Sequence, residues 1–265
     1  MNIIIPIKQV PETSNVKMDP ATGTMVREGV ESIINPLDLY AIEVGIQLKE
    51  KFGGKVTVIT MGPPNAQKAL KEAISMGCDN GILVSSRKFG GSDTWATAYV
   101  LSEAIKNIKD YDLILAGERA TDGDTGQVGP GISSFLDITT ATYVSKIEEI
   151  KDGKITVERI VEGGYEKLRM PLPSLLTVVK EISYPRLPTL RGKQRAKKEE
   201  IPVWSENEIN LDLENLGLTG SPTRVVKIET PKVSRGGTIL TVGKDGDAEH
   251  CVDRLVEFMK NKVLI

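Results

Sequence analysis

The sequence is poor in the residues on which side-chain catalysis usually depends. Among 265 residues there are one histidine, His250, and two cysteines, Cys78 and Cys251. His250 lies at the start of the last predicted helix and is interpreted as a surface residue, which excludes Ser-His-Asp catalysis and metal sites with several histidines. Two cysteines make neither a disulfide scaffold nor a metal site, and both are interpreted as structural.

A strong charge imbalance and a long apolar run are also absent. The 34 basic and 36 acidic residues leave a net charge of −2, so no general attraction to nucleic acid or to a membrane surface is expected. No apolar run approaches the roughly 20 residues of a membrane span. The first residues lack the basic segment and long apolar core of a signal peptide. We therefore expect a cytoplasmic protein with no membrane span and no nucleic-acid partner.

Four short apolar runs alternate with helical patterns in the first part of the chain. Near-continuous apolar character over four to six residues is typical of parallel strands that are covered on both faces. The runs are Ile3–Ile7, Val56–Met61, Gly81–Val84 and Leu113–Ala116. The helical patterns end near Gly53-Gly54 and before Gly77, and a third starts at a possible cap, Asp93. This alternation predicts an α/β fold with a doubly wound, mostly parallel sheet, in which ligands bind at the carboxyl ends of the strands.

The pattern changes after residue 138. Longer strands are predicted over 139–150, 154–161 and 167–179, and Asp152-Gly153 indicates a hairpin, so the sheet gains an antiparallel extension. From Tyr184 the chain loosens, and it ends in an amphipathic helix that Asp247 is predicted to cap. The apolar face of this helix carries Cys251, Val252, Leu255, Val256 and Met259. We predict an α/β domain over residues 1–183 and an arm over 184–265 that wraps around a partner.

The stretch from Gly117 to Gly131 is rich in glycine and follows the fourth strand directly. Glycine lets backbone N–H groups approach an anion, and a helix that opens near Thr125 would favour phosphate at its N-terminus. Asp122 and Asp124 would repel phosphate unless they cap the helix, bind ribose hydroxyls or hold a cation. The stretch matches neither of the two common nucleotide-binding motifs, G-x-G-x-x-G and G-x-x-x-x-G-K-[ST]. A nucleotide site and a simple glycine-rich turn into a helix therefore both remain open.

Two other segments allow two interpretations each. Asn35-Pro36 opens the first helix as N-cap and first helical residue, which does not exclude ligand contact. The basic run over 191–198 lacks interleaved aromatic residues, so single-stranded nucleic acid is disfavoured. It is either a solvated loop or a docking loop, because Leu187 and Leu190 place apolar side chains next to the charges.

Several segments taken together resemble the β subunit of electron-transfer flavoprotein, and their order and spacing match over nearly the whole chain. They are Lys8–Thr13, Ile34–Asp38, Met76–Asp79, Ala120–Gly131, Gly163-Gly164 with Leu168, and Pro185–Lys198. The resemblance implies a universal-stress-like nucleotide-binding core and a heterodimer with an α subunit that carries FAD. The β subunit then holds a second adenine nucleotide, which is AMP in simple members and FAD in electron-bifurcating members. Flavins carry the electrons, which agrees with the lack of a catalytic constellation.

The resemblance also implies the positions of two sites. The nucleotide site would comprise Pro6, Asn35, Pro36, Leu37, Asp38, Met61, Asp122, Gly123, Asp124, Thr125, Gly126, Gln127, Val128, Gly129, Pro130, Gly131, Ile132 and Ser133. Amides near Thr125–Val128 would hold phosphate, with adenine against the backbone at Pro6 and Met61. Residues 185–198 match the recognition loop for the partner, with Leu190 as anchor and Arg191 and Lys193 beside it. Gly220–Arg224 would contact the α subunit.

The bifurcating branch is the preferred interpretation. Val10–Thr13, Asp19-Pro20 and Gly23-Thr24 with Arg27 resemble the N-terminal stretch of bifurcating members, and small residues over 122–126 leave room for a pyrophosphate and a flavin. NADH would then reduce FAD in the β subunit. One electron would pass to ferredoxin or flavodoxin, and the other, through the α-subunit FAD, to an acyl-CoA or hydroxyacid dehydrogenase. The alternatives are an electron carrier with structural AMP and a universal-stress-type nucleotide sensor, although a sensor would have no use for the arm.

Overall fold

The chain forms two compact units, Met1–Val226 and Lys227–Ile265. The computed structural model describes residues 1–12, 17–18, 25–26, 32–226, 237, 239–242 and 248–264. Residues 184–226, which the sequence analysis assigned to an arm, thus belong to the first compact unit, and wrapping of a partner stays a prediction. Asp247, Thr13, Asp19-Pro20, Gly23-Thr24 and Arg27 lie outside the described residues.

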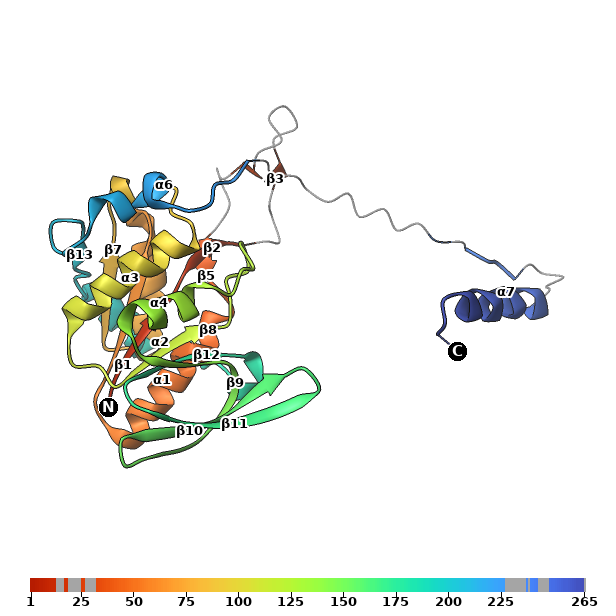
Figure 1. Cartoon of the computed structure of the whole chain (residues 1–265), viewed down its shortest axis with the longest axis horizontal. Coiled ribbons are helices and arrows are strands. Elements are labelled where there is room, and N and C mark those ends of the chain that lie inside the picture. Colours follow the sequence, from red (N-terminus) through yellow and green to blue (C-terminus); the bar gives the residue numbers. More distant parts are fainter. Residues whose placement is uncertain are drawn as a thin grey trace. The chain divides into compact units, whose positions relative to one another are not determined.

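The first unit contains a nine-stranded sheet in the order β11-β10-β9-β12-β8-β1-β6-β7-β13 (Figure 1). Its strands are β1 (Asn2–Pro6), β6 (Lys55–Met61), β7 (Asn80–Val84), β8 (Leu113–Gly117), β9 (Thr139–Lys151), β10 (Lys154–Val161), β11 (Gly164–Pro171), β12 (Ser174–Val178) and β13 (Val203–Trp204). In the sheet order, the seven strands from β9 across to β13 (β9-β12-β8-β1-β6-β7-β13) pair in parallel. β10 and β11 extend the sheet beyond β9 in antiparallel fashion. The predicted doubly wound sheet with an antiparallel extension is confirmed.

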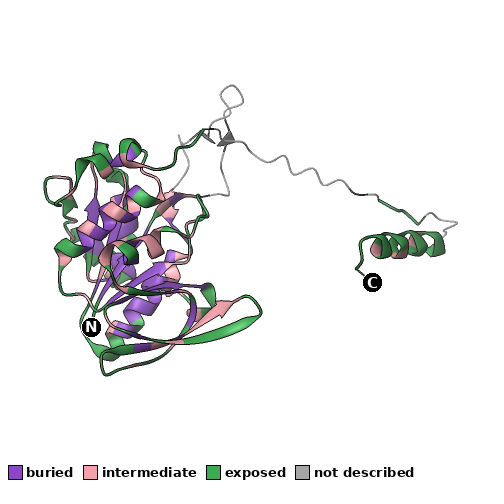
Figure 2. Ribbon diagram, in the orientation of Figure 1, coloured by how far each residue is buried: buried purple, intermediate pink, exposed green. Residues whose placement is uncertain are grey.

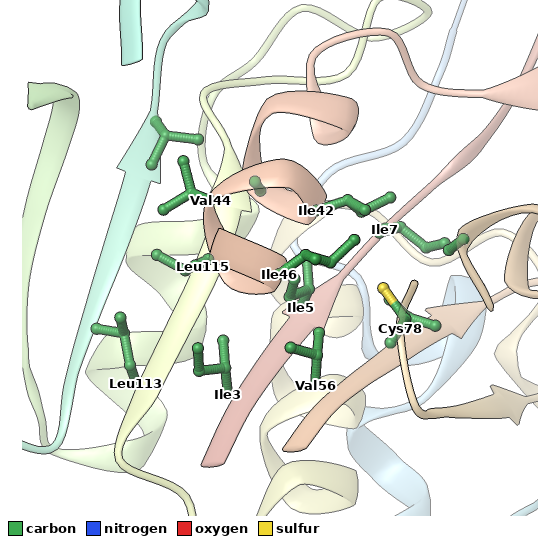
Figure 3. Packing of buried hydrophobic residues seen from close by; sticks show 14 of the residues in the cluster. Ile3, Ile5, Ile7, Ile42, Val44, Ile46, Val56, Cys78, Leu113 and Leu115 are labelled. Atoms are coloured by element: carbon green, nitrogen blue, oxygen red, sulfur yellow. The ribbon is translucent and has the colours of Figure 1, made fainter. Parts of the chain in front are cut away.

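Helices cover both faces of the parallel strands. They are α1 (Asp38–Phe52), α2 (Gln67–Met76), α3 (Thr94–Ile108) and α4 (Val128–Leu136). Helices α1 and α2 pack into one hydrophobic cluster with the sheet, while α3 and α4 pack into a second cluster. Figure 3 shows Ile42, Val44 and Ile46 of α1 above Ile5 of β1 and Leu115 of β8. These buried layers form the purple centre of the first unit in Figure 2.

The helix ends agree with the local signals. Gly53 and Gly77 are the C-cap residues of α1 and α2, with φ of 71° and 140°. Both values lie in a region that glycine adopts without a steric cost. Asp93 caps α3 by accepting a hydrogen bond from the Ala96 N–H at 3.0 Å. The hairpin between β9 and β10 turns at Asp152-Gly153, where both φ values are positive, as that pair predicts.

Some strands differ from expectation. The strand expected over 167–179 is two strands, β11 and β12, separated by Leu172 and Pro173, because proline cannot donate to a ladder. β13 at the other sheet edge was not predicted. Two small antiparallel ribbons pair β2 (Gln9–Pro11) with β5 (Ser32–Ile34) and β3 (Lys17–Met18) with β4 (Met25–Val26).

The remaining described elements of the first unit are two short α-helices and four 3-10 helices. They are α5 (Leu190–Lys198), α6 (Gly217–Gly220) and the short 3-10 helices η2 (Pro64–Ala66), η3 (Arg87–Phe89), η4 (Lys180–Ile182) and η5 (Leu213–Asn215). The second unit contains α7 (Ala248–Asn261), in which no residue is buried within the chain. Cys251, expected to face a helical core, is half-exposed there because the described part of this unit has no core to cover it.

Candidate functional site

The sheet reverses its winding direction between β1 and β8. From β1 the chain moves through β6 to β7, and α3 then carries it back to place β8 on the other side of β1. Such a switch point opens a crevice at the carboxyl ends of the two strands, which is where doubly wound sheets bind ligands. The loop after Pro6 and the loop after Gly117 meet the start of α1 there.

Asn35 joins two of these segments through its buried side chain. Its Nδ2 donates to the Arg119 carbonyl at 2.9 Å, and its Oδ1 accepts from the Thr121 N–H at 3.2 Å. The residue is 1% exposed. The expectation that Asn35 caps α1 is wrong, because its side chain is used across the crevice and α1 has no side-chain cap. Asn35 therefore fixes the loop after β8 to the start of α1.

Asp38 ties the third segment into the same cluster. Its Oδ2 accepts from the Lys8 N–H at 2.7 Å, and the Gly117 N–H and the Asn35 side chain also donate to the carboxyl. Burial raises the pKa of Asp38 from 3.8 to about 7, although these hydrogen bonds act to lower it. A Cβ at Gly117 would lie 2.4 Å from the Asp38 Oδ1, so only glycine fits against this carboxyl.

The acidic residues of the loop are paired with basic ones. Lys8 Nζ contacts Asp122 Oδ1 at 2.7 Å, and Arg119 Nε contacts Asp124 Oδ1 at 2.9 Å. Asp124 has a φ of 58°, and its N–H donates to the Ala120 carbonyl at 2.8 Å. These pairs partly neutralise the carboxylates that would otherwise repel an anion. The sequence pattern showed the acids but not their partners.

The loop then presents backbone donors at the start of α4. The helix begins at Val128, three residues after the expected Thr125. Among the described residues, the amides over 125–129 donate to no protein acceptor. The Gln127 side chain caps nothing and instead accepts from the Thr94 hydroxyl at 3.0 Å. Unpaired amides at a helix N-terminus suit an anionic group such as phosphate.

The other expected site residues lie around this crevice at different depths. Pro6 is buried at the end of β1, and Met61 is half-buried at the end of the neighbouring β6. Pro36 and Gly123 are exposed, and Leu37 is half-buried. In α4, Gly129, Pro130 and Gly131 are half-buried, while Ile132 and Ser133 are buried in the helix packing. Which of them contacts a nucleotide stays a prediction.

Tyr143 borders the same loop and was missed by sequence reasoning. Its hydroxyl lies 3.8 Å from the position that a Cβ at Gly126 would take. The side chain is 42% exposed, and its φ is 58°. Nothing in the alternating pattern of residues 139–150 distinguishes this tyrosine from an ordinary strand residue, so no local signal could have found it.

Comparisons with known proteins agree over the whole chain. A family model described as electron transfer flavoprotein domain matches residues 22–209. An electron transfer flavoprotein subunit beta from Thermoanaerobacterium thermosaccharolyticum is 47% identical over 100% of both chains. The caffeyl-CoA reductase-Etf complex subunit CarD of Acetobacterium woodii is 46% identical over 91% of this chain and 92% of its own. Protein FixA of Azotobacter vinelandii is 43% identical over 96% and 92%.

The chain belongs to the electron transfer flavoprotein β-subunit family. The resemblance found in the sequence is therefore confirmed at the level of family and fold. The universal-stress alternative is excluded as a family assignment. Among the described residues, no helix is long and apolar enough to cross a membrane.

The segment expected to be the recognition loop, residues 185–198, is helical over most of its length. Residues 190–198 form α5, whose N-cap Thr189 accepts from the Gly192 N–H at 2.9 Å. A loop over the whole of 185–198 was thus wrong, because a capped first turn and the packing of Ala196 favour a helix. Leu187 and Leu190 are 84% and 83% exposed.

Ionic contacts hold this segment at its base. Arg186 Nε and Nη2 donate to Glu43 at 2.8 and 3.0 Å, and its Nη1 donates to Glu50 at 2.6 Å. Burial opposes ionisation of Glu43, yet the hydrogen bonds from Arg186 bring the pKa of that carboxyl below its usual range. Arg195 donates to carbonyls of Ile74 and Cys78 at the end of α2. Arg191 and Lys193 remain exposed beside the two leucines.

Gly220–Arg224, expected at the α-subunit interface, makes contacts within the chain. The Thr223 N–H and hydroxyl donate to Asp93 Oδ2 at 2.9 and 2.8 Å, and the Asp93 N–H donates to the Ser221 hydroxyl at 2.8 Å. The segment thus covers the N-terminus of α3. An additional contact with an α subunit stays a prediction.

Proposed function

We propose that this chain is the β subunit of a bifurcating electron transfer flavoprotein and that it binds FAD at the switch point between β1 and β8. The observation that carries the proposal is the set of unpaired amides over 125–129, in the loop that buried Asn35 and Asp38 hold at the switch point. Bound there, a flavin supplies the electron chemistry, with NADH as donor. The residues of the chain bind and orient the nucleotide.

The side chains of the crevice fit a nucleotide better than they fit direct catalysis. Asn35 and Asp38 are occupied by backbone groups of the loops, so they shape the site rather than react in it. Lys8 and Arg119 pair with Asp122 and Asp124 and reduce the negative charge next to the amides. The backbone therefore receives the phosphate, in the manner of other helix N-terminal anion sites.

The open space around the loop would admit a dinucleotide as well as AMP. A Cβ at Gly123 would meet no atom within 4 Å, and residues 121–125 are exposed. A pyrophosphate and a flavin need this room, while a single phosphate does not. AMP in the same crevice is the alternative, and the chain would then be an electron carrier subunit without bifurcation.

The proposed partners are an α subunit, a ferredoxin or flavodoxin, and an acyl-CoA or hydroxyacid dehydrogenase. The relative CarD is named as a subunit of a caffeyl-CoA reductase complex, which supports a CoA-thioester enzyme as one partner class. Exposed Leu187 and Leu190 beside Arg191 and Lys193 suit an apolar pocket with an acidic rim.

The decisive experiment is a count of FAD and AMP in the protein co-purified with its α subunit. Two FAD and no AMP per heterodimer support the proposal, and NADH-driven reduction of ferredoxin is then expected. One FAD with one AMP would refute bifurcation and leave the AMP-binding carrier. Neither nucleotide in the β subunit would refute the site itself.

A glycine substitution tests the position of the site. Gly126 has a φ of +64°, and Gly153 in the hairpin turn has a similar φ of +68°. Gly126→Leu and Gly153→Leu therefore carry a similar backbone penalty, of about 1 kcal/mol. Only Gly126→Leu should lower nucleotide retention in the heterodimer, by tenfold or more in Kd. Equal retention in the two variants would place the nucleotide elsewhere.

A further inference from the structure

Tyr143 has a backbone conformation that a tyrosine rarely adopts. Its φ of 58° lies in the left-handed region, although it sits inside strand β9. Bulky side chains clash with the backbone there, so such a residue is a steric outlier. Outliers of this kind persist only where the surrounding structure imposes them, and they gather at binding sites.

A bulge in the sheet imposes this conformation. The pairing of β9 with β12 shifts register between Leu176 and Val178. At that point the Tyr143 N–H leaves the ladder and donates to the Thr177 Oγ1 at 3.1 Å, and Thr177 is buried. Bulges next to binding sites redirect a side chain that regular pleating would send elsewhere.

The redirected side chain reaches the loop that presents the unpaired amides. The Tyr143 hydroxyl lies 3.8 Å from the place of a Cβ on Gly126, and the side chain stays 42% exposed. Among the described residues the hydroxyl makes no hydrogen bond. A phenol O–H next to an anion cradle can donate to a phosphate oxygen, and a donor to a charged acceptor forms a strong bond.

We propose that Tyr143 is a phosphate-binding residue of the nucleotide site, whose hydroxyl donates to a phosphate oxygen held by the amides over 125–129. The inference rests on the proposed nucleotide site and adds a side-chain donor to it. The strained backbone of Tyr143 is the structural cost of placing that donor next to the loop that follows β8. Packing of the ring against Gly126 alone would need no hydroxyl.

The test compares AMP with adenosine, which lacks the phosphate. Both are measured by equilibrium dialysis on the α–β heterodimer freed of nucleotide. Tyr143→Phe should weaken AMP about tenfold, because a hydrogen bond to a charged group is lost, and should leave adenosine within about twofold. Tyr165→Phe is the matched control, since Tyr165 on β11 is 66% exposed.

A second variant separates binding from folding. Tyr143→Gly removes the hydroxyl and the steric conflict together, so the nucleotide-free protein should melt no lower than the parent while AMP binding falls. Unchanged AMP binding in Tyr143→Phe, or equal loss of AMP and adenosine, would overturn the role of the hydroxyl. If the parent protein bound AMP no better than adenosine, the phosphate site itself would be refuted.

Discussion

The switch point between β1 and β8 and the segment 185–198 present different parts of the chain to a ligand: backbone at the first and side chains at the second. At the switch point, buried side chains such as Asn35 and Asp38 hold the loops in place. Among the described residues, the backbone amides over 125–129 have no protein acceptor and can bind a ligand. In the segment, Arg186 is fixed to α1, and the side chains of Leu187 and Leu190 remain exposed. Backbone amides suit a small anion, while apolar side chains next to basic ones suit a protein surface. The two sites should therefore fail in different ways.

The largest effect is expected at Asp38, through pH. Its carboxyl ionises near pH 3.8 when unfolded and at about 7 when folded, so the folded state binds the proton more tightly. The free energy of unfolding should thus fall by about 4 kcal/mol as pH rises from about 4 to 7, and stay level above. Asp38→Asn has no proton to lose and should remove this slope.

The measurement is urea unfolding of the parent and of Asp38→Asn at several pH values between 4 and 8. Differences between the two curves isolate Asp38 from groups that titrate lower, such as Glu43. Asp137→Asn is the control, because Asp137 is exposed at a left-handed C-cap that asparagine also adopts. Parallel curves for the parent and Asp38→Asn would mean that the buried carboxyl does not titrate in this window.

Asn35→Ala should produce the next largest effect. The substitution removes the buried Asn35 amide and leaves the Arg119 carbonyl and the Thr121 N–H without their partner at part-buried bonds. The expected cost is about 1–3 kcal/mol in unfolding free energy, together with weaker nucleotide binding because the loop after β8 is released. Asn80→Ala, at an exposed residue on β7, is the control. Loss of stability without any loss of nucleotide would separate the loop from the site.

The sequence predicted elements where the signal is local. Gly77 and Asp93 marked helix ends correctly because a positive φ and a cap depend on neighbouring residues. Asn35 was assigned as a cap for the same reason, and wrongly, because its partners Arg119 and Thr121 are distant in sequence. A local pattern cannot show that a tertiary contact has taken a side chain away from its usual role.

The same limit applies to the site as a whole. The strand ends and the glycine-rich stretch predicted that the loops after β1 and β8 come together at the switch point, since both follow from topology and composition. The bulge that redirects Tyr143 depends on register between β9 and β12, and neither strand contains a glycine or proline at that point. The exposure of Leu187 and Leu190 was foreseeable, because charges surround them in the chain.

The smallest effect on stability, and the sharpest on partner binding, is expected for Leu190→Ala. Leu190 is 83% exposed, so its removal should change the unfolding free energy by less than about 0.5 kcal/mol. Electron transfer from the heterodimer to the proposed dehydrogenase partner should fall about tenfold in kcat/KM, mainly through a higher KM for the flavoprotein. Leu213→Ala, at a leucine 57% exposed on η5, should change neither quantity.

Because Leu190 takes no part in the switch-point site, the nucleotide content of Leu190→Ala should stay at the parent level. An unchanged KM would remove the docking role from this segment and leave its exposed leucines unexplained, whereas loss of nucleotide would show that the two regions depend on each other.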